Sequence, residues 1–355
     1  MGLKTGLLLA WLLAAAPAAA DSIRIASYDP NLTRKGPGLL LRDIQAGRDG
    51  QIAAVIAVIA AADADVLLLT GFDWDHDGQA LGAFVQALAS AGVDYPHRFA
   101  GQPNRGIPTG IDMDGDGRLN RAEDMQGWAR FTGQNGLAVL SRLPIGTVTD
   151  YSHQLWRDQP GHLIADAIPP EAAAVQRLST TAHWDVQLQT DPPLHLLAWS
   201  ATPPVFDGPE DRNGRRNHDE NIFWLRHLPD APFVLAGNAN LDPIDGEGRH
   251  EAIRAILSDP RLQDPRPKSE GARLAADPDH RGDPALDTAD WPDGKPGNLR
   301  VTYVLPSAGL RVTGSGTLWP APDTALADQA AQASPHRLVW VDLVIGDQVA
   351  EQRGR

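Results

Sequence analysis

Short apolar runs alternate with helix-like segments along this sequence, and that alternation restricts its fold more than any other feature. Ser22 to Tyr28 alternates polar and apolar residues, as a strand buried on one face does. In Gly50 to Ala62 the large apolar residues recur at helical spacing, and the continuous apolar run Val66 to Thr70 is typical of a buried central strand. This order of strand, helix and strand predicts an α/β fold.

The rest of the sequence repeats these patterns, with three polar interruptions. Further strands are predicted at Leu137–Leu140, Leu178–His183, Leu194–Ala198, Phe233–Ala236, Leu299–Leu305 and Leu338–Leu343. Further helices are predicted at Gly78–Ala91, Asn217–His227 and Glu251–Ser258. The interruptions, rich in Gly and Pro, cover residues 101–135, 203–217 and 259–298. Loops this long inside a compact domain are usually functional, and because no linker or repeat separates the elements, we expect one domain over residues 21–355.

The N-terminus has the pattern of a secretory signal peptide, residues 1–20. Lys4 supplies a positive charge, Leu7 to Ala16 form a short apolar segment, and Ala18-Ala19-Ala20 is a small-residue cleavage signal. The apolar segment is too short to span a bilayer, although an uncleaved N-terminal anchor is the alternative. We therefore expect a mature chain that begins at Asp21 and a periplasmic or secreted protein.

Composition excludes several classes of function. The sequence contains no cysteine, which rules out iron–sulfur clusters, thiolate zinc sites and cysteine nucleophiles. It has 31 Lys and Arg against 45 Asp and Glu, a net charge of -14. Because phosphate neutralisation needs clustered basic residues, this balance argues against a nucleic-acid partner. It leaves a small phosphorylated ligand open.

Residues 112–123 match the calcium-loop pattern D-x-[DN]-x-[DN]-G-x5-E without a gap. The predicted Ca²⁺ ligands are Asp112, Asp114, Asp116, the backbone carbonyl of Arg118, Asn120 and Glu123. Four carboxylates this close together repel one another strongly unless a cation lies among them. The alternative is a solvated acidic turn, since flanking helices are not evident. A partial copy begins at Asp73 but has Phe84 at its twelfth position, so a second loop of this type is not expected.

Another concentration of charge spans Arg212 to Glu220, where guanidinium groups could hold a phosphate. Acidic residues lie in the same stretch, so a structural loop whose charges pair with one another is the favoured interpretation. The sequence contains no G-x-S-x-G, P-loop or H-E-x-x-H motif, and no G-x-G-x-x-G after a strand.

Several segments, read in chain order, resemble the endonuclease/exonuclease/phosphatase superfamily. They are SIRIASYD, DVLLLTGFD, NGLAVLSRLPI, HLLAWSATPPVFDG, FVLAGNANLDP, RVTYVLP and SPHRLVWVDL. The resemblance extends from about Ile23 to Leu343, and GLAVLSRLPI followed by a G-x-x-N-x-D-P turn is its most specific part. It implies a four-layered α/β/β/α sandwich like that of DNase I, in which two mixed β-sheets are flanked by helices.

The resemblance also implies phosphoester hydrolysis with a divalent metal such as Mg²⁺ or Mn²⁺. In that family an Asn on the first strand and a Glu on the second hold the metal, and a His–Asp pair and a G-D-x-N turn act on water and the phosphoryl group. Asn240 and His336 match family positions here. The departures are Asp29 for the Asn, Gly71 for the Glu, Ser200 for a His, Asn238 for the Asp of the turn, Thr302 for the Asp of R-x-D-Y and Pro335 for the Asp of S-D-H.

These departures remove charge from one predicted cleft. General acid–base groups each contribute about 10²–10⁴-fold to a rate, so we expect little or no activity by the family mechanism and a calcium-stabilised binding protein instead. The alternative is a divergent phosphoesterase acting on a phosphorylated small molecule through a rearranged metal site. Asp73 lies two residues after Gly71 and would point to the same face of a continuing strand, where it could hold a cation together with Asp29.

Overall fold

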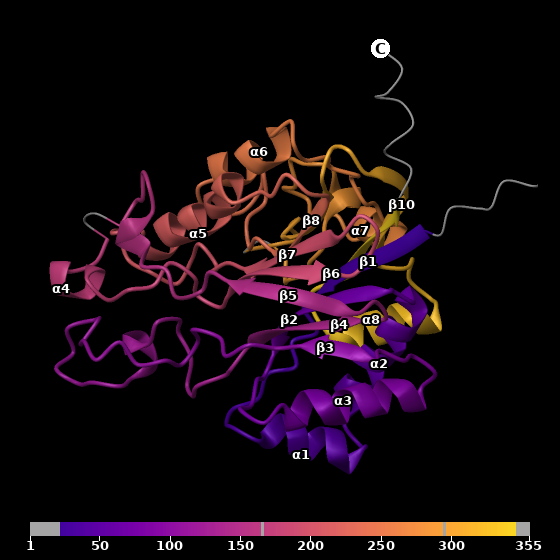
Figure 1. Cartoon of the computed structure of the whole chain (residues 1–355), viewed down its shortest axis with the longest axis horizontal. Coiled ribbons are helices and arrows are strands. Elements are labelled where there is room, and N and C mark those ends of the chain that lie inside the picture. The colour runs from indigo at the N-terminus through magenta and orange to yellow at the C-terminus, as the bar shows by residue number, and fades with distance from the viewer. Residues whose placement is uncertain (1–21, 165–166, 294–295, 346–355) are drawn as a thin grey trace, which may run out of the picture.

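The computed structural model describes residues 22–164, 167–293 and 296–345, in which two mixed β-sheets pack face to face (Figure 1). The first sheet has the order β10 (Arg311–Leu318), β11 (Leu338–Val344), β1 (Ser22–Tyr28), β2 (Val66–Phe72), β4 (Gly136–Ser141) and β3 (His97–Phe99). The second has the order β5 (Ile145–Asp150), β6 (His183–Leu188), β7 (Leu194–Ser200), β8 (Phe233–Asn238) and β9 (Thr302–Pro306). The β1–β2 and β7–β8 pairs are parallel and the other pairs antiparallel.

Helices cover the outer faces of the two sheets (Figure 1). The first sheet is covered by α1 (Leu39–Ala46), α2 (Gly50–Ala62), α3 (Gln79–Ser90) and α8 (Ala325–Ala333). On the side of the second sheet lie α5 (Arg212–Ile222), which continues as a 3₁₀ turn at Phe223–Arg226, and α6 (Glu251–Ser258). The short helices are α4 (Pro170–Ala173), α7 (Glu270–Leu274) and 3₁₀ turns at Ala122–Asp124, Trp156–Asp158 and Pro284–Leu286. The predicted four-layered α/β/β/α sandwich is confirmed.

The apolar run in β2 explains why the sandwich has these layers. Leu67 and Leu69 belong to the core under the helices, whereas Val66 and Leu68 belong to the core between the two sheets. Successive side chains of a strand point to opposite faces, so a strand with helices on one side and a sheet on the other is apolar at every position. Fully burying each such side chain contributes about 1.5–3 kcal/mol.

The hydrophobic patterns of the sequence predicted most helices and strands near their observed positions, but one strand was predicted in the wrong place. The helix predicted at Gly50 to Ala62 has these bounds as α2, and the side chain of Asp49 caps it by accepting the N–H of Ile52. The strand predicted at Leu178–His183 is wrong, because β6 begins at His183. The carbonyls of Leu178 and Ser179 accept hydrogen bonds from the side chain of Arg216 rather than from a neighbouring strand.

Elements that the sequence did not indicate are mostly at the edges. The strands β5 and β10 each end a sheet and are rich in polar residues and glycine, so their alternation is weak. The helices α1 and α8 and the three-residue strand β3 were also not predicted. Across the described part of the chain, no helix has the length and apolarity needed to cross a membrane. The predicted signal peptide, residues 1–20, lies outside the described residues.

Candidate functional site

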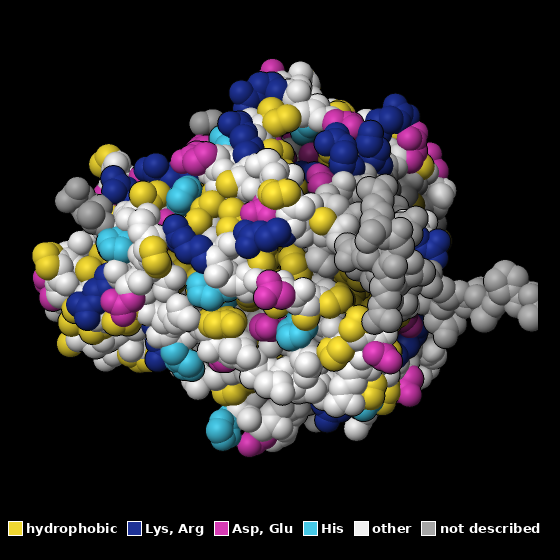
Figure 2. All heavy atoms as spheres, turned by 45° about the horizontal axis from the view of Figure 1, so that its top comes forward, with side chains coloured by type: hydrophobic (Ala, Val, Ile, Leu, Met, Phe, Trp, Pro, Cys, Tyr) yellow, Lys and Arg dark blue, Asp and Glu magenta, His cyan; other side chains and the backbone are white. Residues whose placement is uncertain are grey.

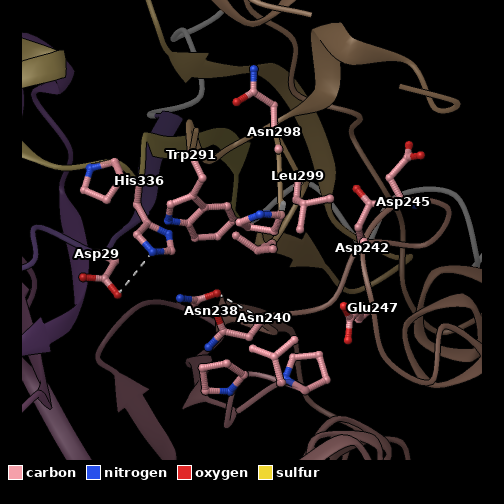
Figure 3. Close-up of a pocket in the computed structure, with 18 of the residues that line it drawn as sticks. Asp29, Asn238, Asn240, Asp242, Asp245, Glu247, Trp291, Asn298, Leu299 and His336 are labelled. Atoms are coloured by element: carbon pink, nitrogen blue, oxygen red, sulfur yellow. Dashed lines mark hydrogen bonds and ion pairs between the residues drawn. The ribbon is translucent and has the colours of Figure 1, made fainter. Parts of the chain in front are cut away.

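A pocket of about 870 Å³ lies at the end of the sandwich where β1, β7 and β8 finish (Figure 3). The family positions that line it are Asp29, Ser200, Asn238, Asn240, Pro335 and His336. In Figure 3, Asp29 and His336 face each other on one side, and Asn238 and Asn240 lie beside them. The structure therefore brings together residues that lie more than three hundred positions apart in the chain.

Strand register aligns three of the altered positions. Ser200 pairs with Asn238 across the parallel β7–β8 ladder, and Asn238 pairs with Thr302 across the antiparallel β8–β9 ladder. These three residues thus form one row across the second sheet. Where the family pattern has a His and two carboxylates, this row holds a hydroxyl, an amide and a hydroxyl, so it carries no titratable group.

Asp29 occupies the space in which a side chain at position 71 would begin. Gly71 has a φ of 111°, and a Cβ built on it would lie 2.1 Å from Oδ1 of Asp29. The family pattern places a neutral Asn at the first position and a Glu at the second. Here the carboxyl group stands on the first segment and the second has no side chain, so the pair keeps one carboxyl group in a different place.

Burial favours the uncharged forms of Asp29 and His336. Oδ2 of Asp29 lies 4.0 Å from Nε2 of His336, and Oδ1 accepts the N–H of Asn31 at 2.9 Å. Burial raises the pKa of the Asp29 carboxyl despite the opposing effects of His336 and this N–H group. Burial also lowers the pKa of His336, against the attraction of Asp29. Both pKa shifts therefore oppose the charged forms of this buried pair.

His336 has no carboxylate behind it. Its Nδ1 and the Oγ1 of Thr302 are buried, and neither has a hydrogen-bond partner among the described residues. The two segments are joined through Thr288, whose Oγ1 accepts the N–H of Thr302 and whose carbonyl accepts the N–H of Arg337. The edge of Trp291 packs against the His336 ring, with centroids 5.1 Å apart. The group that would orient His336 as a base is therefore missing.

The side-chain amides of Asn238, the last residue of β8, and Asn240 stabilise the turn after this strand. Oδ1 of Asn238 accepts the N–H of Asn240 at 3.1 Å, and Nδ2 of Asn240 donates to the carbonyl of Ala201 at 2.7 Å. Asn240 adopts a left-handed conformation with φ 49°, which short amide side chains tolerate better than most residues. The side-chain amide of Asn238 also hydrogen-bonds to the Asp29 carboxyl and thereby lowers its pKa, against the larger effect of burial.

Asp73 is not among the residues that line the pocket, although the predicted Asp29–Asp73 cation pair would place it there. Oδ1 of Asp73 accepts Thr33 Oγ1–H at 2.8 Å and Asn135 N–H at 2.9 Å, and Oδ2 accepts Arg34 N–H at 2.7 Å. The prediction assumed an unbroken strand, but the β2–β4 register shifts between residues 70 and 72, beside the left-handed glycine. Asp73 instead ties three segments together.

Arg105 is a pocket residue that the sequence analysis missed. It is 9% exposed, and its guanidinium donates to Thr181 Oγ1 at 3.0 Å and to the Trp128 carbonyl at 3.2 Å. Burial lowers the pKa of Arg105, while Glu220 and Asp29 oppose that shift, and arginine stays protonated in proteins. A single arginine in the 101–135 insertion carries no sequence signal. Its place in the pocket depends on how the insertion packs against β6.

The charged stretch from Arg212 to Glu220 makes structural contacts, but it is a helix and not the loop of mutually paired charges that the favoured interpretation predicted. It forms most of α5, and its buried Arg216 donates to the carbonyls of Gln126, Arg177, Leu178 and Ser179. Glu220 accepts the N–H groups of Thr180 and Thr202. These contacts hold the 101–135 insertion and the segment before β6 against α5, so the arginines serve packing rather than ligand binding.

Three of the predicted calcium ligands converge. Carboxylate oxygens of Asp112, Asp114 and Asp116 lie within 4.8 Å of one another, and within the described ranges this is the only such group of three His, Asp or Glu residues. The carboxylates accept N–H groups of the loop itself, as Asp112 does from Gly117 at 2.8 Å. Glu123 is outside the group, because its Oε1 accepts Trp128 Nε1–H at 3.2 Å. Asn120 is left-handed, with φ 61°.

Solved structures are similar to this chain at low sequence identity, and the first one named here has the same fold. An endonuclease/exonuclease/phosphatase from Beutenbergia cavernae is 18% identical with a TM-score of 0.56, over 93% of this chain and 73% of that chain. A family protein from Leptotrichia buccalis is 15% identical with a TM-score of 0.49, over 90% of this chain and 99% of that chain. Sphingomyelinase C from Streptomyces griseocarneus is 17% identical with a TM-score of 0.46, over 91% of this chain and 99% of that chain.

A comparison with curated proteins finds no match. The sequence profile described as "Endonuclease/Exonuclease/phosphatase family" matches residues 43–336, which include β2, β8 and His336. That stretch is most of the chain and contains most of the pocket. The chain therefore belongs to the endonuclease/exonuclease/phosphatase family.

Proposed function

We propose that this protein is an exported, calcium-stabilised family member that binds a small phosphorylated molecule in the pocket and hydrolyses little or none of it by the family mechanism. The observation that carries the proposal is the environment of His336 Nδ1: it is buried with no partner among the described residues, and Asn238 and Thr302 stand at the family's carboxylate positions. A general base is helped by a carboxylate that accepts the N–H of its second ring nitrogen and stabilises the protonated ring. No described carboxylate does this at Nδ1, and Asp29 lies 4.0 Å from the other ring nitrogen, Nε2.

The same substitutions make this end of the pocket suitable for an anion without a metal. Arg105 contributes a permanent positive charge and Asn238 contributes an amide donor. Burial raises the pKa of the Asp29 carboxyl, so it disfavours the charged form that would repel a phosphate. Four carboxylates of the family pattern are absent at positions 71, 238, 302 and 335, so little repels a phosphate group.

A small ligand fits better than a nucleic acid. The net charge is -14, and on the face in Figure 2 basic side chains are interspersed with acidic and hydrophobic ones rather than joined in a continuous basic surface. Nucleic-acid affinity rests on many phosphate contacts made by such a surface. A pocket of about 870 Å³ is of the size that binds small molecules.

Calcium binding is supported by the converging carboxylates of Asp112, Asp114 and Asp116. The loop lies in the 101–135 insertion that also supplies Arg105, so an ion there would order the segment that carries the pocket's guanidinium. Extracellular calcium sites need an affinity of only about 10⁻⁴–10⁻³ M. The proposed export, which rests on the N-terminal sequence pattern, would supply that concentration.

The test is calorimetric titration of the chain from Asp21 with inorganic phosphate and a simple alkyl phosphate, without added magnesium. We expect binding, and we expect Asn238→Asp to weaken it, because this nearly isosteric change replaces a donor by a negative charge beside Asp29. Turnover of a chromogenic phosphodiester and nicking of plasmid DNA are then measured with Mg²⁺, Mn²⁺ and Ca²⁺ in turn. Absence of phosphate binding, or turnover that His336→Ala abolishes, would contradict the proposal.

A second candidate is a phosphoesterase with a rearranged metal site, and the position of Asp29 above Gly71 favours it. Magnesium is bound in many sites by one or two carboxylates together with the substrate's phosphate. Asp29 fits that demand as a single carboxylate, and the ion would polarise the phosphoryl group. Asp73 takes no part. Magnesium-dependent turnover that is lost in Asp29→Asn would establish this function.

A further inference from the structure

An apolar wall extends from the phosphate end of the pocket, where Asp29, Arg105 and His336 lie. A phosphate group fills only a small part of a pocket of about 870 Å³, so the organic part of the ligand occupies the rest. The wall consists of two groups of side chains from separate segments, which are Trp291, Leu299 and Val301 in the first and Pro204, Val205 and Phe206 in the second.

Trp291 connects the phosphate end to the apolar wall. Its ring lies against that of His336 with centroids 5.1 Å apart, and it packs on the buried cluster of Ala289, Leu299 and Val301. Figure 3 shows the indole with His336 on one side and Leu299 on the other. Ala289 and Leu299 exchange backbone hydrogen bonds of 3.1 and 3.3 Å, which fix the segment that carries the tryptophan. The indole is thus a positioned apolar surface beside the proposed phosphate site.

Phe206 is held at the pocket despite backbone strain. Its side chain lines the pocket and the residue is 91% exposed, with a φ of 68°, a left-handed conformation that is an outlier for a bulky residue. Asn213 holds the backbone on both sides, because its Nδ2 donates to the Val205 carbonyl at 2.7 Å and its N–H donates to the Asp207 carboxylate. Strained residues that their neighbours hold in place cluster at ligand sites. The folded chain therefore keeps a large apolar ring at the pocket instead of burying it.

The position and charge of the surrounding residues orient the ligand. The segment that carries Phe206 leaves β7 beside the phosphate end, where the carbonyl of Ala201 accepts the Nδ2–H of Asn240 at 2.7 Å. Asp242 and Glu247 also line the pocket, and Figure 3 shows them on the opposite side from the phosphate end. Because these carboxylates repel an anion, the phosphate is directed to the phosphate end and the organic group lies along the apolar wall.

We propose that the ligand is a phosphate monoester of an apolar group, an alkyl or aryl group that packs on Trp291 and is covered by Phe206. This inference rests on the proposed function for the phosphate half only. Removing apolar surface of the ligand and of the wall from water stabilises the complex and needs no polar partner. The hydroxyl groups of a polyol placed against this wall would lose their hydrogen bonds to water without replacement. An apolar ester therefore fits the wall better than a polyol phosphate does.

The experiment is calorimetric titration with methyl, propyl, hexyl, phenyl and glycerol phosphate. We expect the affinity to rise about threefold for each added CH₂ group that reaches the wall. Propyl phosphate should bind about tenfold more tightly than glycerol phosphate, which has the same carbon chain with two added hydroxyl groups. Tighter binding of phenyl than of hexyl phosphate identifies an aryl ligand, and the reverse identifies an alkyl ligand. Affinities that do not depend on the organic group would overturn the inference.

Phe206→Gly tests the wall without endangering the fold. Glycine accepts the left-handed backbone, so this variant should be at least as stable as the parent protein, while its preference for hexyl over methyl phosphate should fall about threefold or more. Trp291→Gln should lower the same preference, which is a ratio measured within each variant. The matched control is Leu274→Ala, which removes an exposed apolar residue outside the pocket and should leave the ratio unchanged. A ratio unchanged in both Phe206→Gly and Trp291→Gln would also overturn the inference.

Failure of the proposed function is distinguishable from failure of this inference. If no phosphate ester binds but hexanol or phenol does, and Phe206→Gly weakens that binding, the apolar half of the site stands and the phosphate half does not. If inorganic phosphate and all of the esters bind with equal affinity, the proposed function stands and the inference about the apolar group is wrong.

Discussion

A Cβ atom at position 71 would lie 2.1 Å from Oδ1 of Asp29, a distance that no pair of non-bonded atoms tolerates. Any residue other than glycine at this position requires Asp29 to move. The two positions are therefore coupled, although one precedes the other by more than forty residues. The family's carboxylate cannot simply be restored on the second strand while Asp29 keeps its place.

This coupling predicts the cost of Gly71→Ala. The change should destabilise the protein by about 3 kcal/mol, of which about 1–2 kcal/mol is the strain of the left-handed backbone. The matched control is Gly110→Ala, which has φ 78° and nothing within 4 Å of the added Cβ, and it should show the strain alone. Chemical denaturation measures both. In an Asp29→Ala background the excess cost of Gly71→Ala should disappear, and equal costs in both backgrounds would contradict the coupling.

Restoring the family pattern should recover activity only when the row across the second sheet is restored as well. Gly71→Glu with Asp29→Asn restores both family residues of the first sheet, although the isosteric amide at position 29 must still turn away from the new Cβ, and His336 still lacks a carboxylate partner. We expect phosphodiester turnover to stay at background until Asn238→Asp, Thr302→Asp and Ser200→His are added, because acid–base groups that act together are strongly non-additive. The assay uses a chromogenic phosphodiester with Mg²⁺. Substantial turnover by the first two changes alone would show that the second-sheet row is dispensable.

Calcium removal should lower the melting temperature. With calcium at about ten times its Kd, binding stabilises the native state by about 1.4 kcal/mol, which corresponds to a shift of about 2–4 °C. Thermal unfolding with and without a chelator measures the effect. Asp112→Asn should abolish the chelator's effect, whereas Asp94→Asn should preserve it. A melting curve that neither the chelator nor Asp112→Asn changes would mean that the loop does not bind calcium.

Asp287 predicts an unusual dependence of stability on pH. Its pKa is about 8 in the folded protein against 3.8 as the ordinary value, so the native state binds the proton more tightly than the unfolded chain. Its contribution to stability therefore falls as pH rises from about 4 to about 8 and then levels off. Asp287→Asn, which cannot ionise, should remove this decline and stabilise the protein most above pH 8. Unfolding free energies of both proteins across this range test the sign.

Local sequence was enough to predict much of the framework. The periodicity of Gly50 to Ala62 predicted α2, and the apolar run from Val66 predicted β2. Both predictions succeed because the burial of a helix face or of a strand covered on both sides determines the hydrophobic pattern of consecutive residues. The family positions around the pocket were also identified from short motifs. Strand β6 was misplaced, since the alternative partner of Leu178 and Ser179 is the side chain of Arg216, thirty-seven or more residues away.

The tertiary structure decided which of the named residues can act together. Asp73 and Asp29 are both carboxylates near the ends of strands, but a shift in register beside Gly71 gives Asp73 three internal hydrogen bonds and leaves Asp29 in the pocket. Arg105, which also lines the pocket, carries no motif. A motif records neighbours along the chain, whereas a pocket is made by long-range packing, so its charges and its unfilled hydrogen bonds exist only after the chain has folded.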